Sequence, residues 1–151
     1  MGSFRFVDEV AADRGVDLSA RSLTDAFETA ARALVEMTVD PSTVQESIAR
    51  HIVLDAPTLE DLLFDWLSEL IDLEDRYAEV YVRTAVQVSG SGPCRLVARL
   101  HGGRIVPGRT ERRADVQGVS LRPFVLEPCN GGWHAHFVVD LRVDAASGSS
   151  W

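Results

Sequence analysis

Hydrophobic residues recur at helical spacing over 59–71, with polar residues between them. Such a stripe predicts an amphipathic helix over 59–76, or two residues shorter, with Thr58 as its N-cap and a sheet or second helix beneath it. A second stripe predicts a helix that Ser22 opens and that ends near Thr38, where turn-forming residues follow. The chain is therefore expected to contain two amphipathic helices.

In the rest of the chain, hydrophobic and polar residues alternate as they do in half-buried β-strands. Pro123 lacks the backbone N–H that a central strand needs, so an edge position or a bulge is expected there. Cys129-Asn130-Gly131-Gly132 predicts a hairpin turn before the last strand. The predicted strands cover 4–7, 16–18, 43–56, 80–88, 94–101, 115–121, 124–127 and 133–141.

These elements predict one α+β domain over residues 1–143, with a mixed, largely antiparallel β-sheet system and two α-helices packed on it. A length of 151 residues fits a single domain with its own core. Residues 144–151 are mostly small, and they are expected to form a flexible C-terminal tail.

No run of apolar residues approaches the ~20 that a membrane-spanning helix needs. Asp8, Glu9 and Asp13 interrupt the place where a signal peptide would carry its apolar segment. A cytoplasmic protein without a membrane segment is therefore expected. Cys94 and Cys129 form no metal-binding motif, and in a reducing compartment they are expected to be core or loop residues.

The formal net charge of −8 argues against strong direct binding of nucleic acid through its phosphates. All 15 cationic side chains are arginines, so lysine-based covalent chemistry is excluded for this chain. The sequence has no Gly-rich phosphate loop, no nucleophile elbow and no His-Glu-x-x-His motif. We therefore assign no catalytic residues and expect a protein that is not an enzyme.

Two sets of residues have the chemistry to bind a metal ion. His134 and His136 lie two residues apart on a predicted strand, so both point to one face about 7 Å apart and could chelate one ion. Asp140 shares that face, but it lies about 13 Å from His136 and is too distant to join them. The acidic stretch from Asp8 to Asp13 suits a hard cation. A half-exposed strand face and a solvated turn remain the alternative interpretations.

Several stretches, taken in order, resemble the archease family. The best match is Leu-Glu-Asp-Leu-Leu-Phe-Asp-Trp-Leu-Ser-Glu-Leu at 59–70, and the family's Glu-Val-Lys-Ala-Val-Thr is similar to Asp-Val-Gln-Gly-Val-Ser at 115–120. The family's opening motif, approximately Asp-His-Thr-Ala-Asp, is similar to the stretch from Asp8 to Asp13. Further matches lie at 22–31, 36–40 and 138–141, and together they cover nearly the whole chain.

The resemblance implies a non-enzymatic accessory protein. Archeases are partners of the RtcB-type RNA ligase of tRNA splicing and RNA repair, and they help that ligase to acquire its guanylyl group and to turn over repeatedly. The resemblance also implies a bound divalent cation, typically calcium. Its ligands would be the carboxylates of Asp13 and Asp140 and the backbone carbonyl of Leu141, all of them hard oxygen ligands.

Some positions depart from the family pattern, so the chain is identified as a divergent, bacterial-type member. The family's histidine is replaced by Glu9, or by Val10 in an ungapped alignment, its lysine by Gln117, and its Tyr-His pair by Leu121-Arg122. One alternative is therefore a binding or chaperone-like protein of the same fold that has lost ligase activation. Another is a small metal-dependent hydrolase that uses the histidine pair.

Overall fold

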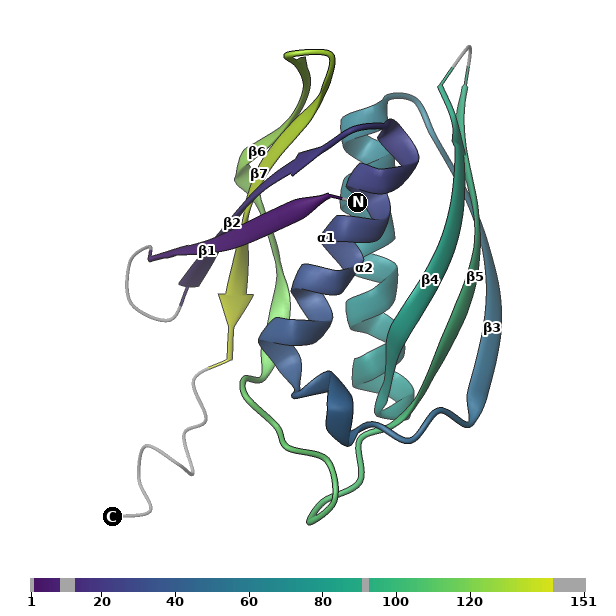
Figure 1. Ribbon diagram of the computed structural model, residues 1–151, viewed down its shortest axis with the longest axis vertical. Coiled ribbons are helices and arrows are strands. Elements are labelled where there is room, and N and C mark those ends of the chain that lie inside the picture. Colours follow the sequence, from purple (N-terminus) through teal and green to yellow (C-terminus); the bar gives the residue numbers. More distant parts are fainter. Residues whose placement is uncertain (1, 9–12, 91–92, 143–151) are drawn as a thin grey trace.

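Two antiparallel β-sheets enclose a pair of α-helices in the computed structural model (Figure 1). The structure describes residues 2–8, 13–90 and 93–142, apart from the side chain of Arg122. Within them the elements follow the order β1 (Ser3–Asp8), β2 (Asp13–Ala20), α1 (Leu23–Thr38), a 3-10 helix (Pro41–Thr43), β3 (Ile48–Ala56), α2 (Leu59–Tyr77), β4 (Glu79–Ser89), β5 (Cys94–Arg104), β6 (Val116–Cys129) and β7 (Gly132–Leu141). The predicted tail at 144–151 lies outside the described residues.

The four-stranded sheet has the order β1-β2-β7-β6, and the three-stranded sheet has the order β3-β5-β4. The predicted α+β fold with largely antiparallel sheets is confirmed. All strand pairs among the described residues are in fact antiparallel. Figure 1 shows both helices lying between the sheets, which leaves the outer face of each sheet uncovered by helices.

Both helices begin where their N-caps predict. The Ser22 hydroxyl accepts a hydrogen bond from the backbone N–H of Asp25 at 3.1 Å, and the Thr58 hydroxyl accepts one from that of Asp61 at 3.1 Å. These bonds satisfy donors that the first helical turn leaves without partners. The second helix ends at Tyr77, and its C-cap Ala78 has a left-handed φ of 55°, which stops the helical hydrogen-bond pattern.

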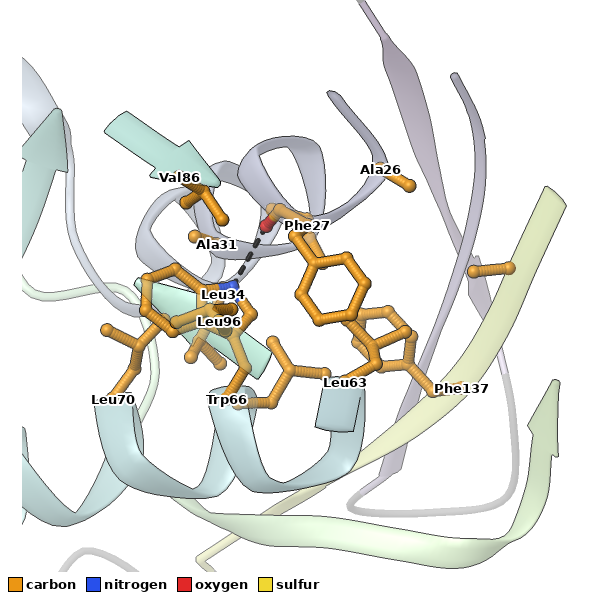
Figure 2. Close-up of a cluster of buried hydrophobic side chains, with 14 of the residues drawn as sticks. Ala26, Phe27, Ala31, Leu34, Leu63, Trp66, Leu70, Val86, Leu96 and Phe137 are labelled. Atoms are coloured by element: carbon orange, nitrogen blue, oxygen red, sulfur yellow. Dashed lines mark hydrogen bonds between the residues drawn. The ribbon is translucent and has the colours of Figure 1, made fainter. Parts of the chain in front are cut away.

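Trp66 of α2 lies at the centre of the core (Figure 2). Its side chain is fully buried, and its indole N–H donates a hydrogen bond to the backbone carbonyl of Phe27 in α1 at 2.9 Å. The polar atom of this large side chain is therefore satisfied inside an apolar layer. Neighbouring core residues come from both helices and both sheets, among them Ala31, Leu34, Leu63, Leu70, Val86, Leu96 and Phe137.

Charged side chains form hydrogen bonds with both edge strands of the three-stranded sheet. Glu28 of α1 accepts a hydrogen bond from the backbone N–H of Val86 on edge strand β4 at 2.9 Å. Across the same sheet, Arg50 of edge strand β3 donates two hydrogen bonds to the buried carboxylate of Glu79 on β4, at 2.6 and 3.0 Å. The hydroxyl of Tyr81 also donates to this carboxylate. The bond to Glu28 occupies a backbone N–H of an edge strand, which discourages pairing with a strand of another molecule.

One strand prediction was wrong at its start. The segment 43–56 was expected to be extended, but the strand begins only at Ile48. Asp40 caps a 3-10 helix that opens at Pro41, and its carboxylate accepts a hydrogen bond from the N–H of Ser42 at 3.0 Å. Local side-chain bonding of this kind competes with strand formation.

The bulge and the hairpin turn were predicted correctly. Strand β6 is an edge strand, and its pairing with β7 is interrupted between Val119 and Phe124, the segment that contains Pro123. Asn130 and Gly131 both have positive φ, 51° and 79°, as the two central residues of a type I′ turn require. Neither described helix has the length and apolar content needed to cross a membrane.

Candidate metal site and the polar face of the four-stranded sheet

The outer face of the four-stranded sheet carries the candidate site residues. On β2 and β7, alternate residues point inward and are buried, including Val16, Leu18, Ala135, Phe137 and Val139. Since side chains alternate along a strand, Asp13 and Asp17 of β2 and His136 and Asp140 of β7 share the opposite, outer face. Strand β7 thus places His134, His136 and Asp140 on one face, as predicted.

Asp13 and Asp140 lie directly opposite each other across the β2–β7 ladder. Cβ atoms of such a pair are about 4.5–5.5 Å apart, and like charges so placed destabilise a sheet unless something compensates them. Both residues are half-buried, and no described side chain donates a hydrogen bond to Asp13 or forms an ion pair with it. The pairing therefore places two carboxylate side chains next to each other on the outer face, and a cation bound there would offset their repulsion.

Strand β6 passes Asp140 with irregular pairing on both sides. Gly118 is the partner of Asp140, and the register shifts before it at Gln117 and again after Val119. The hydroxyl of Ser120, where the second irregularity begins, donates a hydrogen bond to Oδ1 of Asp140 at 2.7 Å. Bulges of this kind are frequent beside functional sites, because they redirect a side chain.

The chain just after Leu141 is held from two directions. The backbone N–H of Arg142 donates to the carbonyl of Asp115 at 2.7 Å, and its guanidinium lies 3.5 Å from the Asp115 carboxylate and 3.8 Å from that of Asp75. These contacts fix the backbone next to the Leu141 carbonyl, the third predicted oxygen ligand.

A second polar cluster lies on the same face. Nε2 of His134 is 2.7 Å from the Asp17 carboxylate, and Nδ1 of His134 is 3.0 Å from the Glu127 carboxylate, so the ring bridges β2 and β6 across β7. His136 Nδ1 is 3.5 Å from the same oxygen of Asp17, and Arg5 of β1 is 3.6 Å from its other oxygen. The cluster therefore joins all four strands.

Titration in this cluster is coupled through Asp17. Hydrogen bonds to the carboxylates of Asp17 and Glu127 raise the pKa of His134 above its usual value, although partial burial opposes this. Burial raises the pKa of Asp17, but the hydrogen bond from His134 and the charges of His134, Arg5 and His136 outweigh it and leave that pKa lowered. The cluster thus favours an imidazolium between two carboxylates.

Over 2–8, 13–90 and 93–142, no three or more His, Cys, Asp or Glu side chains are grouped so that they could hold a metal ion. His134 has both ring nitrogens within hydrogen-bond distance of carboxylates, so the placement of this histidine is explained without a metal ion. The candidate cation site instead has two carboxylates with a backbone carbonyl nearby. Sequence reasoning missed Asp17 and Glu127, because only the register of β2 and β6 against β7 brings them to the histidines.

A model of the archease protein family matches residues 4–141, and thus all the elements described above except the first residue of β1. This chain belongs to the archease family. It is 30% identical over 122 residues to protein archease of Methanosarcina mazei, covering 80% of this chain and 84% of that protein. It is 28% identical over 141 residues to protein archease of Sulfurisphaera tokodaii, covering 93% and 100% respectively.

The archease fold is also found among solved structures. The solution structure of Methanobacterium thermoautotrophicum protein 1598 superimposes with a TM-score of 0.76 at 29% sequence identity. The match covers 91% of this chain and 98% of that one. The fold expected from the archease resemblance is therefore shown.

Two of the departures from the archease pattern, Gln117 and Leu121, lie on β6 near the Asp140 end of β7. Gln117 is exposed and lines a shallow surface hollow with Asp72 and Asp75 of α2. Leu121 lies in the irregular segment of β6 and is 71% exposed, the largest value among the exposed large hydrophobic residues described. Glu9 and Val10, the two candidates for the replaced histidine, lie outside the described residues, and so does the side chain of Arg122. Two of the departures thus lie on the surface next to the candidate cation site.

Proposed function

We propose that this archease-family protein is an accessory protein that activates an RtcB-type RNA ligase and binds a divalent cation, typically calcium, through Asp13, Asp140 and the carbonyl of Leu141. The observation that carries the proposal is the direct pairing of Asp13 with Asp140 across β2 and β7, in a chain that the archease model matches almost throughout.

The donor set fits a hard cation. Two carboxylates and a carbonyl are oxygen ligands of the type that calcium prefers, and water completes such sites. A bound divalent cation would supply the positive charge that offsets the repulsion between the two paired carboxylates. Asp13 begins β2 and Asp140 lies near the end of β7, so their side chains would link these two strand ends.

Electrostatics favours a basic protein as the partner. The net charge of −8 suits association with an enzyme that binds RNA, because opposite fields speed encounter and favour the correct register. The same charge disfavours strong direct contact with RNA. We accordingly assign to this protein no catalytic residues of its own and a place in the cytoplasm beside the ligase.

The proposal is tested by measuring how much of the same organism's ligase becomes covalently guanylylated on its histidine from GTP, with pyrophosphate released. Wild-type protein is expected to raise the guanylylated fraction or its rate of formation, whereas D13A and D140A are expected to lose this effect. H51A, on the outer face of the other sheet, is the matched control and should behave as wild type. No difference between wild type and buffer would refute ligase activation.

A diverged binding or chaperone-like protein of the archease fold is the second candidate. It is favoured by the exposed Gln117 in place of the family's lysine, beside the Asp72 and Asp75 carboxylates. This candidate predicts that the wild-type protein is inactive in the guanylylation assay while Q117K gains activity. Full activity of the wild type, unchanged in Q117K, would dispose of it.

A further inference from the structure

We propose that Ser120 is a positioning residue of the cation site, which orients the carboxylate of Asp140 toward the bound ion. The inference rests on the proposed cation site and adds to it a residue outside the implied ligand set. Its hydroxyl donates to Oδ1 of Asp140 at 2.7 Å, and both side chains are half-buried.

The path of β6 explains how Ser120 reaches this position. Gly118 and Val119 pair with Asp140 and Val139, but the next paired residues are Phe124 and Phe137. Four residues of β6, 120–123, thus lie opposite a single residue of β7, Val138, so the regular strand pairing stops at Ser120. By alternation, Ser120 lies on the same outer face as Asp140.

A hydroxyl in this position acts on the carboxylate of Asp140 by orienting it. It holds the carboxylate in one orientation, which lowers the entropy lost when an ion binds. A carboxylate has about four lone-pair sites, so one bond to Ser120 leaves sites for a cation.

The backbone leaves space on the same side of Asp140. A Cβ added to Gly118, the ladder partner of Asp140, would meet no other atom within 4 Å. An ion with its waters can therefore approach the pair beside β6. Loss of a residue that orients a metal ligand typically weakens affinity about 10–100-fold, and we expect a loss of that size here.

The test is calcium affinity by titration calorimetry. S120A removes the hydroxyl, S120T keeps it, and S19A removes an exposed serine from the same sheet face away from Asp140. We expect S120A to bind calcium about 10–100-fold more weakly, and S120T and S19A to bind as the wild type does. All should unfold at the same temperature without calcium, since a purely structural role would lower that temperature.

Terbium luminescence lifetimes in H₂O and D₂O count the waters on the ion. S120A should leave this number unchanged, because Ser120 acts through Asp140, whereas a direct ligand would be replaced by one additional water.

Three outcomes would overturn the inference: calcium affinity retained in S120A while D140A loses it, a loss in S120A that S120T shares, or an additional water in S120A. If wild type, D13A and D140A all have the same affinity, or none binds calcium, the proposed cation site itself fails.

Discussion

Replacing Trp66 with phenylalanine tests whether the contact between the two helices is as strong as its burial and hydrogen bond indicate. The indole is fully buried and its N–H donates to the Phe27 carbonyl at 2.9 Å. W66F keeps an aromatic ring but removes that donor and part of the side-chain volume. The Phe27 carbonyl lies inside α1, where the helical bond already occupies it, so it is not left without any donor.

The expected loss has two parts. Loss of a hydrogen bond whose acceptor keeps another donor costs about 1 kcal/mol. Deletion of one buried methylene costs ~0.5–1.5 kcal/mol, so the smaller ring should cost about 1–2 kcal/mol, less if the core relaxes. The total of roughly 2–3 kcal/mol corresponds to a fall in Tm of roughly 4–12 °C for a chain of this length.

Urea denaturation measures this loss, with the midpoint lowered and the m value unchanged. Trp133 provides a matched control, because it is only half-buried and forms no hydrogen bond through its indole with any described residue. W133F should lose less than about 1 kcal/mol, since little volume and no hydrogen bond are lost from the core. Equal losses in W66F and W133F would refute the reasoning.

Three further predictions concern pH, packing and the partner surface. The pKa of His134 is raised, so its contribution to stability is complete below its unfolded pKa of about 6.5 and is lost as pH rises through the folded pKa. In urea denaturation from pH 6 to 9, the free energy of unfolding should therefore depend less on pH in H134Q than in the wild type. The same pH dependence in both proteins would contradict this. G102A should lose about 3 kcal/mol, since its Cβ would lie 1.8 Å from the carbonyl oxygen of Val80; G118A, with open space around its Cβ, is the control, and equal urea midpoints would show the assigned packing to be wrong. L121S should leave calcium affinity and stability unchanged yet weaken ligase activation, because Leu121 is 71% exposed beside the candidate site; full activation would exclude Leu121 from the partner surface.

Local signals in the sequence predicted the elements well where side chains act on their own backbone. Ser22 and Thr58 cap the helices as expected, and Asn130-Gly131 makes the turn. The expectation failed at 43–47, because Asp40 and Pro41 set a 3-10 helix over Pro41–Thr43 and the strand begins only at Ile48. Local hydrogen bonds prevailed over strand formation there, and the residues that form them lie just outside the alternating pattern.

Long-range contacts could not be predicted from pattern alone. The arginines of the loop at 107–113 are exposed, but Arg112 also binds Glu74 and Asp115, and Arg113 donates to the carbonyl of Glu36. These contacts depend on where the loop crosses the helix ends. The acidic end of α2 is likewise paired within the chain, for example Asp72 with Arg76 at 2.9 Å.

One part of the candidate cation site could be assigned from the sequence, and another part depends on long-range contacts that the sequence does not show. Asp13 and Asp140 were assigned through the archease resemblance, since 127 positions separate them in the sequence. Their opposition follows only from the register of β2 against β7, which the hydrophobic alternation of each strand permits but does not determine. Ser120 carried no signal as a partner of Asp140, because its approach depends on the irregular pairing of β6.

RNA-end joining at substoichiometric ligase tests the central claim most directly. The same organism's ligase is supplied with GTP, a divalent ion and an excess of RNA ends, with wild-type protein, D140A or no addition. Ligase activation predicts many joined products per ligase with wild type and about one without it, and D140A should fall to the level without addition. Equal product in all three, from a ligase that completes a single turnover, would contradict the proposed function.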